Sequence, residues 1–243
     1  MKKLILAAVA LFAVTALQAK VTLQSGSADF MNDADATANL TFDFEDCIVV
    51  SFQAGKVSKD FGSLYDYIAS QQLEKEKTIP QSSGYDMARA QFNKANKKGL
   101  KLVASDQAIE SHNKAQNPDP SMSAKDQKKL QKADKWLTKY GCVWDKSNVK
   151  YDIIVHADTI SAGSAGAAAM FGGSMIPGAD GGSAMIGWVE VIDRASHDVI
   201  CEARIGKFYG QGSFAFQQRF WNVLGGCIAK ELPDLKKLAA KKK

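Results

Sequence analysis

The fold is decided by the stretch from Tyr151 to Leu232, which opens with YDIIVHADTI (residues 151–160) and continues with MIGWVEVID (185–193) and VICEARI (199–205). Apolar and polar residues alternate in the first and third segments, which is typical of half-buried strands. The middle segment is apolar on both faces except at Glu190, which indicates a central strand. The turn-like RASHD (194–198) predicts that the second and third segments form an antiparallel hairpin.

Beyond Gly212 the hydrophobic period changes from two to about 3.6, so the sequence predicts a helix whose apolar stripe lies on the sheet. Ser213 is a suitable N-cap and Pro233 a suitable stop. The stripe consists of Phe216, Phe220, Val223, Leu224, Cys227 and Ile228.

The preceding half of the chain predicts a mixture of strands and helices. An edge strand is expected within 20–33, a strand over 38–46, its extension or a separate strand over 47–52, and a short strand over 100–103. Helices are expected over 60–72, 85–97 and 123–140, the last opened by a capping box at Ser123. This order predicts an α+β fold, with a mixed, largely antiparallel sheet and helices mainly on one face.

Residues 1–19 resemble a signal peptide. Lys2 and Lys3 precede an apolar run that ends near Ala19, a small residue suited to cleavage. Because no cysteine lies near that position, a lipid anchor is not expected. The sequence therefore predicts a periplasmic or secreted protein with one domain over 20–235 and a basic flexible tail over 236–243.

The charge of the chain gives little sign of a polyanionic partner. The formal net charge is +5, and loss of Lys2 and Lys3 leaves about +3. Much of this excess lies in the tail, without the interleaved aromatic residues that grip nucleic acid. We expect no nucleic-acid partner and at most weak peripheral contact with an anionic membrane, although solvation alone also accounts for the tail.

The cysteines and histidines do not form a metal-binding motif. Four cysteines would remain after export, and an even number in an oxidising compartment favours at least one disulfide, with the pairing open. Buried thiols that pack as small apolar groups are the alternative. The histidines are scattered and no CxxC is present, so neither a metal nor another cofactor is expected. The cysteines are Cys47, Cys142, Cys201 and Cys227.

A candidate polar cluster lies on the outward positions of the three strands. His156, Asp158, Glu190 and Arg204 come close together if the strands are neighbours. A histidine beside carboxylates can act as an acid or a base. Cross-strand charge pairs are ordinary on a solvent face, however, and no GxSxG serine accompanies them.

The segment Ser161–Ser183 is rich in Gly and Ala and has no charge before Asp180. It lacks the Gly-Lys-Ser/Thr ending of a phosphate loop, so nucleotide binding is not favoured. Two interpretations stand: a mobile connection, or an uncharged surface that docks on a partner, a bilayer or a second copy. The candidate interaction residues are Met170, Phe171, Met175 and Ile176.

Several of these stretches together resemble small bacterial envelope proteins that carry a domain of unknown function. They are YDIIVHADTI, the Gly/Ala-rich loop, GWVEVID (187–193), EARIG (202–206) and FNKANKKGLKLV (92–103). More distantly, the chain is similar to the α/β domain of curli-secretion and penicillin-binding-protein-activator lipoproteins. The resemblance implies helices over one face of a mixed sheet and no enzymatic residues.

These observations predict an exported, non-catalytic binding or assembly module whose partner is an envelope protein or a second copy. One alternative is a small-ligand protein or hydrolase that uses His156, Asp158 and Glu190, which would require these side chains to converge in a pocket. Another is a structural envelope protein held to anionic surfaces by its Lys tail.

Overall fold

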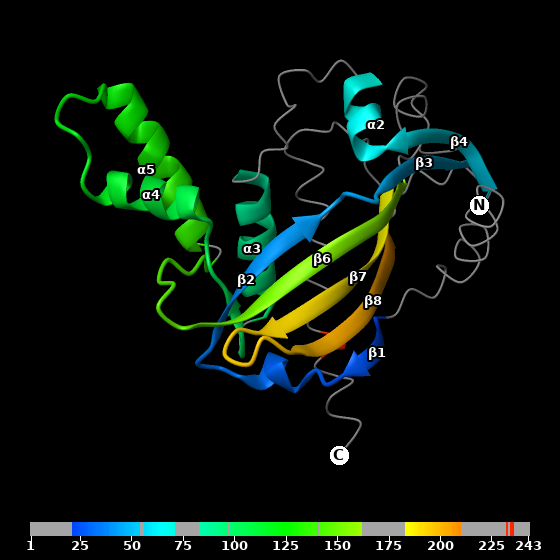
Figure 1. The fold of residues 1–243 in the computed structure, drawn as a ribbon. Helices are drawn as coiled ribbons and strands as arrows, with labels where there is room; N and C mark the ends of the chain where they lie inside the picture. The colour runs from blue at the N-terminus through cyan, green and yellow to red at the C-terminus, as the bar shows by residue number, and fades with distance from the viewer. Residues whose placement is uncertain are drawn as a thin grey trace.

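The computed structural model describes residues 21–53, 56–70, 83–96, 98–139, 141–161, 183–209, 232 and 234–235. They form a mixed sheet of eight strands with helices, which confirms the predicted α+β class (Figure 1). Among these residues, no helix has both the length and the apolar character needed to cross a bilayer. The strands are β1 (Thr22–Gly26), β2 (Thr37–Asp43), β3 (Ile48–Gln53), β4 (Lys56–Ser63), β5 (Lys101–Leu102), β6 (Val149–Ser161), β7 (Ser183–Asp193) and β8 (Val199–Tyr209). The α-helices are α2 (Leu64–Ser70), α3 (Ser83–Ala95), α4 (Asp106–Gln116) and α5 (Ala124–Lys139).

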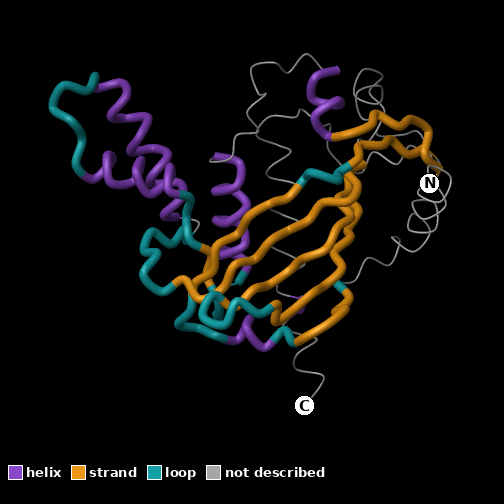
Figure 2. Tube along the Cα trace, viewed as in Figure 1, coloured by secondary structure: helices purple, strands orange, loops and turns teal. Residues whose placement is uncertain are grey.

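The strand β6 organises the sheet. The main strand order is β1-β8-β7-β6-β2-β5, and β6, β7 and β8 are antiparallel neighbours. The β7–β8 pair is the hairpin that the turn at 194–198 predicts. The other edge of β6 is shared by two parallel strands, β2 along its first part and β3 along its last. Figure 2 shows these strands side by side across the sheet. β1 pairs with β8, so the expected edge strand is present.

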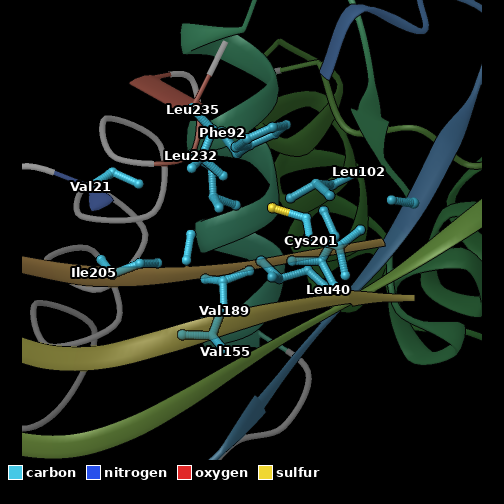
Figure 3. Close-up of a cluster of buried hydrophobic side chains, with 14 of the residues drawn as sticks. Val21, Leu40, Phe92, Leu102, Val155, Val189, Cys201, Ile205, Leu232 and Leu235 are labelled. Atoms are coloured by element: carbon cyan, nitrogen blue, oxygen red, sulfur yellow. The ribbon is translucent and has the colours of Figure 1, made fainter. Parts of the chain in front are cut away.

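The core lies between one face of the sheet and α3. Ile153, Val155, Val189 and Ala203 point to this side and are fully buried, because every second residue of a strand points to the same face. Phe92 of α3 packs over them (Figure 3). The inward alternation expected for β6 and β8 is confirmed, and Leu232 and Leu235 join the same cluster.

Buried polar side chains fasten α3 to its neighbours. Arg89 pairs with Asp86 and donates to the carbonyl of Leu40 in β2. Asp86 in turn accepts hydrogen bonds from the backbone N–H and hydroxyl of Ser105, at 2.9 and 2.6 Å. Ser105 is the N-cap of α4, since its hydroxyl accepts from the N–H of Ala108. The Asp86–Arg89 pair thus connects α3 to β2 through the guanidinium and to the start of α4 through the carboxylate.

The helices α4 and α5 form a hairpin that projects beyond the β2 side of the sheet (Figure 1). His112 stacks on Trp144 and contacts the carboxylate of Asp134 in α5. Ser123 is the N-cap of α5, as predicted, because its hydroxyl accepts from the N–H of Asp126 at 3.2 Å. The Asp126 carboxylate in turn accepts from this hydroxyl at 2.7 Å. No residue of α5 is fully buried.

Two details of the secondary structure differ from the sequence prediction. Residues 60–63, expected in a helix, belong to β4, and α2 begins at Leu64, where Ser63 caps it by accepting from the N–H of Asp66. Of the two alternatives for 47–52, the structure has the separate strand, β3, and not an extension of β2. The helix α4 was not expected. Of the predicted C-terminal helix only Leu232 is described, and it is helical, as are Asp234 and Leu235 beyond the expected stop at Pro233.

Candidate functional site

The face of the sheet opposite α3, here called the outer face, carries the predicted polar cluster. No described helix lies over it; it faces the viewer in Figures 1 and 2. Strand periodicity directs the even-numbered residues of β6 and β7 and the odd-numbered residues of β2 to this side. The half-buried or exposed side chains of the outer face include Asn39, Thr41, Asp43, Asp152, His156, Asp158, Trp188, Glu190, Glu202 and Arg204.

His156 lies at the centre of the outer face between carboxylates from two neighbouring strands. Its Nδ1 is 3.0 Å from Oδ2 of Asp43 in β2, and its Nε2 is 3.5 Å from Oε2 of Glu190 in β7. The ring stacks on the indole of Trp188, its register partner in β7, with centroids 3.8 Å apart and planes 9° apart. The histidine therefore links three adjacent strands.

Asp158 and Arg204 form a second pair on the outer face, with Nη1 and Oδ2 2.7 Å apart. The register of β6 against β7 shifts between Ala157 and Thr159, and Asp158 lies at this bulge. Burial raises the pKa of Asp158 above its usual value, although the nearby Arg204 guanidinium acts in the opposite direction. Each of the two side chains is 35% exposed, so the pair is only partly hydrated.

Further polar contacts extend the outer face towards its borders. Asn39 donates to Asp152 at 2.9 Å, and the same carboxylate is 3.2 Å from Nε of Arg194. At the β1 edge, the hydroxyl of Ser25 donates to Glu202 at 2.6 Å. These contacts fix the outward side chains across the width of the sheet.

The arrangement does not offer His156 as an accessible base. One ring nitrogen faces Asp43, and the other is buried without a hydrogen-bond partner and faces Glu190. The Trp188 indole lies against the ring itself. In the described part of the chain, no group of three or more His, Cys, Asp or Glu side chains has the arrangement needed to hold a metal ion.

The structure brings together all four residues of the predicted cluster, and it adds two that sequence reasoning missed. Asp43 and Trp188 are direct neighbours of His156. Asp43 alternates with the inward Phe42 and Leu40 in the strand expected over 38–46, and this pattern alone does not connect it to His156. The apolar pattern around Trp188 identified a central strand, but only the register of β6 against β7 places the indole beside His156.

The described cysteines are buried and unpaired. Cys47, Cys142 and Cys201 are free thiols, so no disulfide joins any two of them, whereas Cys227 lies outside the described residues. Burial raises the thiol pKa to about 12 for Cys47 and Cys142 and to about 11 for Cys201. The candidate interaction residues of the Gly/Ala-rich loop, Met170, Phe171, Met175 and Ile176, also lie outside the described residues.

We expect these three thiols to resist alkylation in the folded chain. Only the thiolate reacts, and a pKa raised by two or more units lowers its fraction at pH 8 by about a hundredfold or more. Peptide mass spectrometry after iodoacetamide treatment, with and without denaturant, measures the labelling of each cysteine separately. Rapid native labelling of Cys201, comparable with the denatured chain, would show that its site is open.

Comparison with known proteins gives only a remote similarity. No protein-family model and no curated protein matches the chain. Among solved structures, a PelC dodecamer from Paraburkholderia phytofirmans is similar at 13% identity with a TM-score of 0.38, over 89% of this chain and 96% of that one. A dodecamer of a single-residue PelC variant from the same organism gives 12% and 0.36, over 89% and 97%. These values are too low to assign a function or an assembly to this chain.

Proposed function

We propose that this protein is an exported binding module and that the outer face of its sheet is the surface that receives the partner. The observation that carries the proposal is the array around His156, in which Asp43, His156, Trp188 and Glu190 form a connected group across three strands. Half-buried aromatic and charged side chains held by such contacts are pre-organised for recognition. No described helix covers them (Figure 1).

The same geometry favours binding over acid–base catalysis. A general base needs a nitrogen or oxygen within hydrogen-bond reach of the substrate proton. Here both ring nitrogens of His156 are directed at carboxylates, and Nε2 is buried. His156, Asp43, Glu190 and Trp188 instead contact one another, and these contacts fix the side-chain positions, as a pre-organised recognition surface requires. Export of the module is proposed from the signal-like residues 1–19.

Crosslinking from the outer face in intact cells tests the proposal. Thr41 is exposed on β2 beside the array, so a photo-crosslinking amino acid there is expected to capture a discrete partner. The matched control is the same amino acid at Gln107, which is exposed on α4. Glu202→Lys is expected to reduce the Thr41 product by about fivefold or more, because a reversed charge on a binding face opposes the partner. Equal products from Thr41 and Gln107, or none from Thr41, would contradict the proposal.

A further inference from the structure

The outer face is acidic although the chain as a whole is basic. Five carboxylates (Asp43, Asp152, Asp158, Glu190 and Glu202) accompany two guanidinium groups, those of Arg194 and Arg204. Each arginine is already paired with one aspartate. The carboxylates of Asp43, Glu190 and Glu202 therefore give the surface a negative potential that attracts a cationic partner.

A complementary surface exists on α5. Four exposed lysines, Lys125, Lys128, Lys132 and Lys135, recur at spacings of three, four and three residues, which places them in one stripe along the helix. Within the described residues, none of the four forms an ion pair. The acidic residues of α5 are engaged elsewhere, Asp126 with Ser123 and Lys129 and Asp134 with His112.

The dimensions of the two surfaces agree. From Lys125 to Lys135 the helix rises about 15 Å, at about 1.5 Å per residue. The outer-face carboxylates lie on β2 (Asp43), β7 (Glu190) and β8 (Glu202). The distance across the sheet from β2 through β6 and β7 to β8 is about 14 Å, at about 4.8 Å between neighbouring strands. A helix laid across the strands would thus bring successive lysines over successive carboxylates.

The two surfaces do not meet within one chain. In the described residues α5 packs on α4 and touches α3, and its hairpin projects from the sheet (Figure 1). None of the ion pairs of the outer face includes a lysine of α5. The lysine stripe and the outer-face carboxylates can therefore meet only if they belong to different molecules.

We propose that the lysine stripe of α5 docks on the outer face of a second copy of this chain. The contact joins two different surfaces, so it is head-to-tail and each copy can both give and receive a helix. The proposal rests on the proposed function in one respect, because it names the partner of the same face. Exposed charges are screened by salt, so the assembly should weaken as ionic strength rises.

Sedimentation velocity of the purified mature chain measures this assembly. We expect concentration-dependent oligomers at about 20 mM salt and mostly monomer at about 500 mM, where the Debye length is only a few ångströms. The triple reversal Lys128→Glu, Lys132→Glu and Lys135→Glu should raise the dissociation constant at least about tenfold. Its control reverses Lys94, Lys98 and Lys146, which are exposed outside the stripe, to give the same net charge.

Mixing two variants tests the docking geometry directly. The α5 triple reversal and a second variant, Glu190→Lys with Glu202→Lys, should each be monomeric at low salt and should assemble with each other. A native chain that remains monomeric at low salt, or an α5 triple that assembles as well as its control, would overturn the proposal. Binding to anionic vesicles without self-assembly would also overturn it, in favour of a membrane partner for α5. In that case the cellular crosslink from Thr41 still tests the proposed function, because a partner other than a second copy could bind the outer face.

Discussion

The Asp86→Ala variant is expected to lose about 3–5 kcal/mol of unfolding free energy, the range for breaking one side of a buried ion pair. The side chains of Asp86 and Arg89 are only 3% and 8% exposed. Removing the carboxylate leaves the Arg89 guanidinium without its counter-charge and the N–H and hydroxyl of Ser105 without their acceptor. Burial already lowers the pKa of Arg89 even with Asp86 present, which shows how poorly the site tolerates an isolated cation.

Urea unfolding of two comparison variants separates this network from simple loss of a helix cap. Ser105→Ala removes the N-cap hydroxyl of α4 but leaves the ion pair, and should cost about 1 kcal/mol. In the double variant Asp86→Ala with Arg89→Ala the uncompensated charge is absent, so its cost should be well below the sum of the single costs. Additive costs, or an Asp86→Ala cost no larger than that of Ser105→Ala, would show that the ion pair does not couple α3 to α4.

The strands β6 and β8 could be predicted because a single face of each is buried. In β6 and β8 the inward positions are apolar and the outward ones mostly polar, so periodicity alone identified both strands and their faces. The helix α4 was not predicted because its described buried residues are the small Ala108 and Ala115, which make no apolar stripe. Its clearest signal was the N-cap at Ser105, followed by Asp106 in the first turn.

The prediction for 60–72 was wrong at its start because local and tertiary preferences differ there. Phe61 and Leu64 have helical spacing, but Phe61 lies in β4, which pairs with β3. Ser63 marks the boundary, since its hydroxyl and Asp66 form the capping contact that begins α2. Pairing of β4 with the preceding strand β3 decided the structure, and helical spacing within 60–72 does not include that partner.

The candidate site was only half predictable for a related reason. Alternation identifies His156, Asp158, Glu190 and Arg204 as outward residues, which come close together only if their three strands are neighbours. Asp43 lies more than a hundred residues before His156, and their contact depends on the parallel pairing of β2 with β6. The pairing of a parallel strand so far away in sequence leaves no local sequence signal, whereas the short turn between β7 and β8 predicts their hairpin.

The Gly187→Ala variant is expected to lose about 3 kcal/mol or more of unfolding free energy, because β6 leaves no room for a methyl group at this position. A Cβ atom on Gly187 would lie 2.0 Å from the carbonyl oxygen of His156 and 3.1 Å from the Cα of Ala157. These are backbone atoms beside the bulge of β6, so no side-chain rotation relieves the overlap. The two central strands would have to separate where His156 stacks on Trp188.

Gly62→Ala is the matched control. It is the same substitution at a glycine whose replacement is opposed by its positive φ and not by overlap with a neighbouring strand. Gly62 has a φ of +76°, but the nearest atom to its added Cβ is the carboxylate oxygen of Asp66 at 3.3 Å, the end of a side chain. The cost there should be about 1–2 kcal/mol, the value for a non-glycine residue in the left-handed region. Urea unfolding compares the two variants. If steric overlap between strands outweighs backbone strain, Gly187→Ala is the less stable and also loses the Thr41 crosslink, because the outer face distorts with β6. Equal costs would mean that β6 moves away easily, and the array around His156 would then be too loosely held to serve as a pre-organised surface.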